Sequence, residues 1–242
     1  MSSRYILALI AGASAAGLYL AAMKLSAVVN MIQQVFYYAF QIDASIEYES
    51  QGDLAYLSKV YWVFSFVLIV LTAVLMCILP AIGGLVLQGD FVSASIYLPL
   101  ALYSAFIDCL FCYFKSLYSA YKKTFRSMLS TLAGAVTNIA LCFLLIPGFG
   151  IWGALLALLV SNIVMSTIRA IDTKQFASID QRWRSNAIPI LLIGLQVLCL
   201  SVGFAWSVEV SVLICVILIA FLLLSYRSEI RVMFEFVKQS RR

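Results

Sequence analysis

The chain has 242 residues, of which 64% are hydrophobic and 11% are charged, and its formal net charge is +5. A soluble domain carries about 25% charged residues because its surface faces water, so this composition excludes an ordinary soluble protein. The basic residues lie in short connections and at the C-terminal end, which favours membrane anchoring over a nucleic-acid partner.

The apolar residues are gathered in runs that predict membrane-spanning helices. Several runs exceed the roughly 18 residues that mark a span, and the ten-residue alternation typical of membrane strands is not seen. Helices remain as the way to satisfy the backbone in lipid, so we predict an all-α, polytopic membrane bundle. We expect an N-terminal stub at 4–11 and seven full spans, at 18–42, 61–87, 94–119, 127–147, 151–171, 187–206 and 209–226.

The stub leads into a joint, IAGASAAGLYLAA, in which Gly12 and Gly17 are five residues apart. A second joint, IPGFGIWGALLALL, places Gly148 and Gly153 at the same spacing after another apolar run. Each is typical of a tight turn that opens a helix with small residues in its first turn. Two copies of this device indicate a repeated helical fold, as in many secondary transporters, and we expect both turns outside the membrane.

The span 18–42 carries most of the polar side chains found within the spans. At 100° per residue they fall within about half of the helix circumference, and the opposite half is apolar. This face predicts either the lining of a wet cavity, which we favour, or interhelical hydrogen bonds with a lysine reaching toward the membrane surface. The candidate cavity residues are Lys24, Asn30, Gln33, Gln34, Tyr37, Tyr38 and Gln41.

The span 94–119 contains Asp108, the deepest acidic residue, near the middle of its helix. An intramembrane carboxylate is a functional candidate, and two roles stay open: coupling to a cation, or an ion pair with a cation such as Lys24. Lys115, two turns further on, is interpreted as an anchor. The span 61–87 has few polar residues and contains Pro80, so we expect it to face lipid and to kink.

The four-residue link Pro147–Gly150 joins the spans 127–147 and 151–171, which are therefore expected to lie antiparallel and in contact. Small residues recur every four positions on both, a pattern that lets helices approach closely in lipid. They are Ser130, Gly134 and Asn138 on the first helix and Gly153, Ala157 and Ser161 on the second. We also expect Asn138 and Asn162 to form a hydrogen bond across this seam.

Basic residues gather in alternate connections, which sets the orientation. The positive-inside rule places these connections and the C-terminus in the cytoplasm. The residues are Lys115, Lys122, Lys123 and Arg126 in one connection, Arg169, Lys174, Arg182 and Arg184 in another, and Arg227, Arg231, Lys238, Arg241 and Arg242 in the tail.

Motifs of enzymes, nucleotide motors and metal sites are missing from the sequence. Histidine, the commonest acid–base and metal residue, does not occur. The six cysteines fall mostly within apolar runs, where they are interpreted as packing residues. We therefore predict no enzymatic activity, no metal and no cofactor.

Two stretches of the chain resemble a known family. AAGLYLAAMKLSAVVNMIQQVFYYAF is similar to the G-x-Y-x-x-A-x-K-L helix of polysaccharide-biosynthesis flippases, the O-antigen flippases among them. YKKTFRSMLSTLAGAVTNIALCFLLIPGFGIWGALLALLVSNIV resembles the basic loop, the asparagine-containing helix and the L-I-P-x-x-G joint of that family. These proteins belong to the multidrug/oligosaccharidyl-lipid/polysaccharide (MOP) exporter superfamily.

The resemblance implies the second half of a MATE-like transporter that is built of two six-helix lobes. Residues 1–172 would form the C-terminal lobe with its first helix truncated, and residues 173–242 a cytoplasmic loop, two additional helices and a basic tail. Arg4 matches the basic residue of an Asp-Arg pair that many members carry, and Ser3 stands in place of its acidic partner. Lys24 matches the lysine of the family helix.

The implied activity is movement of undecaprenyl-diphosphate-linked oligosaccharide across the inner cell membrane by alternating access. The expected partners are membrane lipid, the lipid-linked oligosaccharide and a missing N-terminal half, because family members are about twice as long. Two alternatives stay open. One is a cation-coupled exporter of small molecules from the same superfamily, and the other is a non-transporting membrane partner in a glycan-assembly complex.

Overall fold

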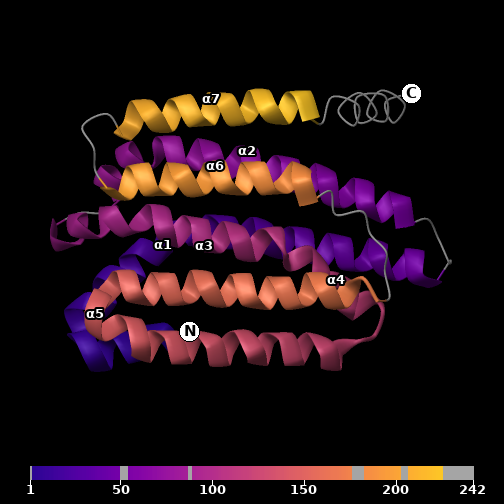
Figure 1. Ribbon diagram of the computed structural model, residues 1–242, viewed down its shortest axis with the longest axis horizontal. Coiled ribbons are helices and arrows are strands. Elements are labelled where there is room, and N and C mark those ends of the chain that lie inside the picture. The colour runs from indigo at the N-terminus through magenta and orange to yellow at the C-terminus, as the bar shows by residue number, and fades with distance from the viewer. Residues whose placement is uncertain (1, 50–53, 87–88, 176–182, 203–206, 226–242) are drawn as a thin grey trace.

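The computed structural model describes residues 2–49, 54–86, 89–175, 183–202 and 207–225, and helices dominate these segments, which confirms the predicted all-α class (Figure 1). The helices lie roughly side by side, with α7 at one edge and the two arms of α5 at the opposite edge (Figure 1). The elements are α1 (Ser2–Glu49), α2 (Leu54–Val86), the 3-10 helix η1 (Gly89–Tyr97), α3 (Leu98–Leu110), α4 (Cys112–Ala120), α5 (Thr124–Thr173), α6 (Trp183–Val202) and α7 (Ser207–Ser225).

Four described segments are long and apolar enough to cross a membrane, as expected of a multi-pass membrane protein. They are Ser2–Lys24, Ser58–Pro80, Phe91–Ala120 and Thr124–Thr173, and shorter apolar segments occur in α6 and α7. The first contains a break in the helix at Gly12, and it shares only residues 18–24 with the span predicted at 18–42. The count of seven spans stays a prediction, and the basic tail and most of the loop before α6 lie outside the described residues.

Glycines break α1 and α5 at the two predicted joints. Gly12 adopts φ 89° and ψ 167°, and Gly150 adopts φ 53° and ψ −124°. A positive φ is disfavoured by a Cβ atom, so glycine is the residue suited to both positions. The break at Gly150 turns α5 into two antiparallel arms, which are visible at the lower edge of Figure 1 and confirm the predicted hairpin.

The two arms of α5 meet along the predicted seam, and all six of its small residues are buried. A Cβ atom on Gly153 would lie 2.5 Å from the carbonyl oxygen of Leu145, so the turn leaves no room for a side chain there. Asn138 Nδ2 donates to Ser161 Oγ at 3.4 Å across the seam. This close approach is what small residues permit between helices in lipid.

The expected hydrogen bond between Asn138 and Asn162 is not formed. Asn162 follows Ser161 by one residue, and the 100° step of the helix turns its side chain away from the seam and toward α3. There its Nδ2 donates to the carbonyl oxygen and to Oγ of Ser104, both at 3.2 Å. Asn138 Oδ1 instead accepts from Ser3 Oγ at 2.8 Å, which ties the first arm of α1 to α5.

The expectation that α2 simply faces lipid is wrong for one of its faces. Tyr61, Phe64, Leu68, Ile69, Ala73 and Met76 are buried and recur at helical spacing. The ring of Phe64 stacks on Phe36 of α1, with centroids 3.5 Å apart. Pro80 lies inside the helix near its end. This apolar face attaches α2 to the bundle. The polar face of α1 packs against other elements, namely α3 and α4.

The span predicted at 94–119 is divided in the structure. It begins within η1, and Phe111, with φ −97° and ψ 1°, separates α3 from α4. Both short helices are largely buried between α1 and α5. Their position places the polar residues of this segment against two neighbours at once.

Candidate functional site

Two glutamines of the predicted polar face point inward and bond to α3 and α4. Gln33 Nε2 donates to Asp108 Oδ2 at 3.2 Å and lies 3.5 Å from the carbonyl oxygen of the same residue. About two helical turns further along α1, Gln41 Nε2 donates to Ser119 Oγ at 2.8 Å. These contacts correspond to the alternative interpretation of the face, in which polar side chains bind neighbouring helices.

Tyr37 lies between these two glutamines and is half-buried. The Lys115 ammonium lies 5.0 Å from the centroid of the Tyr37 ring, within range of a cation–π interaction. Asn30 is also half-buried on this flank. Gln33, Tyr37 and Gln41 thus form a polar seam with Asp108, Lys115 and Ser119, which we call the α1–α4 seam.

The other polar residues of α1 point away from the bundle. Lys24 and Gln34 are exposed, and Tyr38 is 64% exposed. The exposed half also carries apolar residues, among them Met31 and Val35. The predicted set is therefore split: one part is held in interhelical contacts, and the other part faces out of this bundle.

Arg4 and Asp108 are placed differently from each other. Arg4 lies on the first arm of α1, half-buried, and its guanidinium carbon lies 4.5 Å from the ring centroid of Tyr5. Asp108 is half-buried, and among the described residues no cation lies within ion-pair distance of it. The ion pair considered between Asp108 and Lys24 is not formed, because Lys24 is on the exposed side of α1.

Arg169 is the charged residue whose position the sequence misjudged. The basic-residue pattern assigned it to a cytoplasmic connection, yet it lies within the second arm of α5 and is only 4% exposed. Its Nε donates to Ser130 Oγ at 3.1 Å, and its Nη2 donates to Thr131 Oγ1 at 2.9 Å. The available signal was its spacing of eight from the seam residue Ser161, which puts both on one face of the helix.

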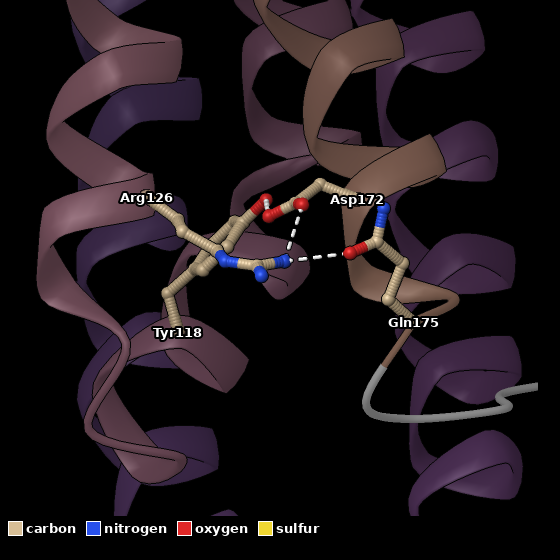
Figure 2. A network of polar contacts seen from close by, with 4 residues as sticks. All are labelled: Tyr118, Arg126, Asp172 and Gln175. Carbon is tan, nitrogen blue, oxygen red and sulfur yellow. Dashed lines mark hydrogen bonds and ion pairs between the residues drawn. The ribbon is translucent and has the colours of Figure 1, made fainter.

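A further polar network closes the open end of the α5 hairpin (Figure 2). Arg126 Nη1 contacts Asp172 Oδ1 at 2.7 Å and Gln175 Oε1 at 2.8 Å. The hydroxyl of Tyr118, which lies on α4, donates to Asp172 Oδ2 at 2.8 Å. Asp172 therefore links both arms of α5 to α4.

Comparison of the chain with models of protein families, with curated proteins and with solved structures finds no match. The described residues likewise hold no group of three metal-ligating side chains. What the geometry provides is an outward polar stripe on α1, a hydrogen-bonded α1–α4 seam with a carboxylate, and a buried guanidinium on α5.

Proposed function

We propose that this chain is one lobe of a flippase of the MOP superfamily, which moves a lipid-linked oligosaccharide across the cytoplasmic membrane. The site is the exposed polar stripe of α1, formed by Lys24, Gln34 and Tyr38. In this proposal a second six-helix lobe lies opposite the stripe and completes the cavity. The same proposal includes a lobe formed by residues 1–172, additional elements at 173–242 and a C-terminus in the cytoplasm.

The observation that carries the proposal is the outward position of Lys24, Gln34 and Tyr38 on a helix rich in apolar residues. A charged side chain at mid-depth in a bilayer costs about 3 kcal/mol on insertion scales. Lys24 lies twelve residues beyond Gly12, or about 18 Å at 1.5 Å per residue, which is well below a turn at the membrane surface. A wet cavity removes the cost of such a position.

The chemistry of the stripe suits a lipid-linked oligosaccharide. An ammonium group attracts a diphosphate, while an amide and a phenol hydrogen-bond to sugar hydroxyls. The apolar residues beside them, Met31 and Val35, suit the acyl part of the ligand. No covalent step is needed, so the proposal requires binding and alternating access alone.

The test is export of glycan by the organism that makes this chain, with single substitutions at the stripe. Lys24→Ala removes a charged contact of about 1.5–3 kcal/mol and should lower the export rate by roughly tenfold or more. Gln34→Ala should lower it by roughly fivefold. Lys59→Ala, at an exposed lysine of α2 outside the stripe, is the matched control and should export at the normal rate. Normal export by Lys24→Ala and Gln34→Ala, with normal amounts of protein in the membrane, would contradict the site.

One observation favours the cation-coupled exporter as a second candidate. The Asp108 carboxylate is half-buried, and its hydrogen-bond donor is the neutral amide of Gln33. A carboxylate without a cation beside it is suited to taking up a proton or a sodium ion. Ion-dependent efflux of a dye that Asp108→Asn abolishes, together with unchanged glycan export, would favour this function over the flippase.

A further inference from the structure

A cluster of polar side chains lies where α2, α6 and α7 pack together, at the edge of the bundle that α7 forms (Figure 1). Gln196 Nε2 donates to Ser211 Oγ at 2.7 Å and lies 3.4 Å from Cys77 Sγ. Cys77 Sγ in turn lies 3.5 Å from the carbonyl oxygen of Ser211. These three residues come from three different helices, so their contacts hold the Cys77 sulfur at the point where the helices meet.

The thiol of Cys215 belongs to the same cluster. Cys215 follows Ser211 by four residues, which puts both side chains on one face of α7. The Cys215 thiol lies within hydrogen-bonding reach of the Cys77 thiol, and both cysteines are free in the structure. Because the two sulfurs are already in contact, rotation of the side chains can bring them to the S–S distance of about 2.05 Å that a disulfide bond requires.

The two thiols differ in their access to a reagent. Cys77 is half-buried, whereas Cys215 is only 7% exposed. The amide of Gln196 is also directed at the Cys77 sulfur, and a donor in this position stabilises the negative charge that develops when the thiol loses its proton. An accessible cysteine with a second thiol beside it is typical of redox-sensitive sites. Cys77 is therefore placed to react first, and Cys215 is placed to react with its product.

A second pair of thiols shows that contact alone does not create such a site. Cys109 and Cys112 also lie within hydrogen-bonding reach of each other. They are only 0% and 2% exposed, so an oxidant in the surroundings does not reach either sulfur. This pair is an internal control for Cys77 and Cys215, because it has the contact between thiols without the access.

From these contacts we infer that Cys77 and Cys215 are a site of reversible oxidation, at which hydrogen peroxide converts the two thiols to a disulfide bond between α2 and α7. The Cys77 sulfur attacks one oxygen of the peroxide and the O–O bond breaks, which gives a sulfenic acid on Cys77 and a first water that carries the thiol proton. The Cys215 sulfur then attacks the Cys77 sulfur. The S–O bond breaks, the S–S bond forms, and the proton of Cys215 leaves with the second water.

The step is balanced, since two thiols and one peroxide give one disulfide and two waters. Exchange with a dithiol reductant returns both thiols. While it is formed, the bond joins α7 covalently to α2. The site lies away from the exposed stripe of α1 and does not depend on the proposed transport function.

The test uses the full chain in isolated membranes, which are treated with hydrogen peroxide and then dissolved in SDS with N-ethylmaleimide to block the remaining thiols. Mass spectrometry of the digested protein should find two peptides linked through Cys77 and Cys215, and dithiothreitol should separate them. Cys109 and Cys112 should carry N-ethylmaleimide. The inference is overturned if Cys77 and Cys215 both carry N-ethylmaleimide after the peroxide treatment, or if Cys77 is linked to a different cysteine.

Three variants test the roles of the two thiols. Cys215→Ser leaves the oxidised Cys77 without a second thiol, so dimedone, which traps sulfenic acids, should label Cys77. Cys77→Ser should leave the buried Cys215 unlabelled. Gln196→Leu removes the amide donor and should slow formation of the disulfide by roughly threefold. Labelling of Cys215 in Cys77→Ser, with none of Cys77 in Cys215→Ser, would overturn the assignment of Cys77 as the thiol that meets the peroxide.

Discussion

Substitution of Gly153 by alanine tests how closely the two arms of α5 approach each other. A Cβ atom at this position would lie 2.5 Å from the carbonyl oxygen of Leu145 and 2.6 Å from its carbonyl carbon. Ordinary van der Waals contact begins at 3.4 Å, so the turn would have to open by about 0.9 Å. The obstacle is backbone, which cannot rotate away as a flexible side chain can.

The expected loss follows from this displacement. Overpacking of a well-packed interior costs typically 1–3 kcal/mol. Because backbone atoms must move here, we expect Gly153→Ala to lower the free energy of unfolding by about 3 kcal/mol. Gly134→Ala should cost less, since its Cβ would lie 3.1 Å from Cβ of Met165 and the neighbour must give by only a few tenths of an ångström.

Gly148→Ala is the matched control, because a Cβ at this position meets nothing within 4 Å. It should leave stability unchanged or raise it by up to about 1 kcal/mol, the helix-propensity gain of alanine over glycine. Unfolding in mixed detergent and SDS micelles, followed by the fluorescence of the four tryptophans, with Trp152 beside the turn among them, measures all three variants. If Gly153→Ala and Gly148→Ala unfold at the same fraction of SDS, the close approach at the turn is refuted.

Two further substitutions test polar contacts away from the turn. Asp172→Ala removes the charged acceptor of the buried Tyr118 hydroxyl and should cost about 1.5–3 kcal/mol. Arg126→Gln removes the exposed ion pair and the exposed hydrogen bond to Gln175, and it should cost at most about 1 kcal/mol in the same unfolding assay. Equal losses for the two variants would show that the Tyr118 contact contributes nothing. Gln196→Leu replaces a buried amide, whose oxygen has no partner among the described residues, with an apolar side chain of similar size, so it should change the free energy of unfolding by less than about 1 kcal/mol. Gln196→Ala leaves a cavity and should cost about 2–5 kcal/mol. A loss for Gln196→Leu as large as that for Gln196→Ala would mean that the hydrogen bond to Ser211 stabilises α6 against α7 far more than expected.

The helices and the α5 hairpin could be predicted from the sequence because their causes are local. Long apolar runs require helices in lipid, and a glycine that must adopt a positive φ marks a turn wherever it interrupts such a run. The small residues every four positions then define the seam, and the structure buries all of them. These features depend on residues that are close together in the chain, so the sequence is enough to predict them.

The division of the polar face of α1 could not be predicted in the same way. Gln33 and Gln34 are adjacent in sequence and 100° apart on the helix, and the boundary between buried and exposed depends on where α3 and α4 pack. Residue spacing defines a face but not its neighbour. The sequence therefore predicted both glutamines in one cavity, whereas in the structure Gln33 donates a hydrogen bond to Asp108 and Gln34 is exposed.

Arg169 shows a limit of a different kind. The positive-inside rule counts basic residues near the ends of spans and takes no account of which side chains a tertiary contact withdraws from water. The partners of Arg169 lie 38 and 39 residues earlier in the chain, on the other arm of the hairpin. The spacing from Ser161 indicates the face on which Arg169 lies, but its partners are set by the antiparallel arrangement of the two arms.

The hydrogen bond between Ser3 and Asn138 has a consequence for the order of events during biosynthesis. Its two ends are 135 residues apart in the chain. At about 5–20 residues per second, a ribosome needs about 7–27 s to make the second partner after the first. The first arm of α1 is therefore made well before its partner on α5, and a ribosome that stalls between the two would leave this arm without the contact.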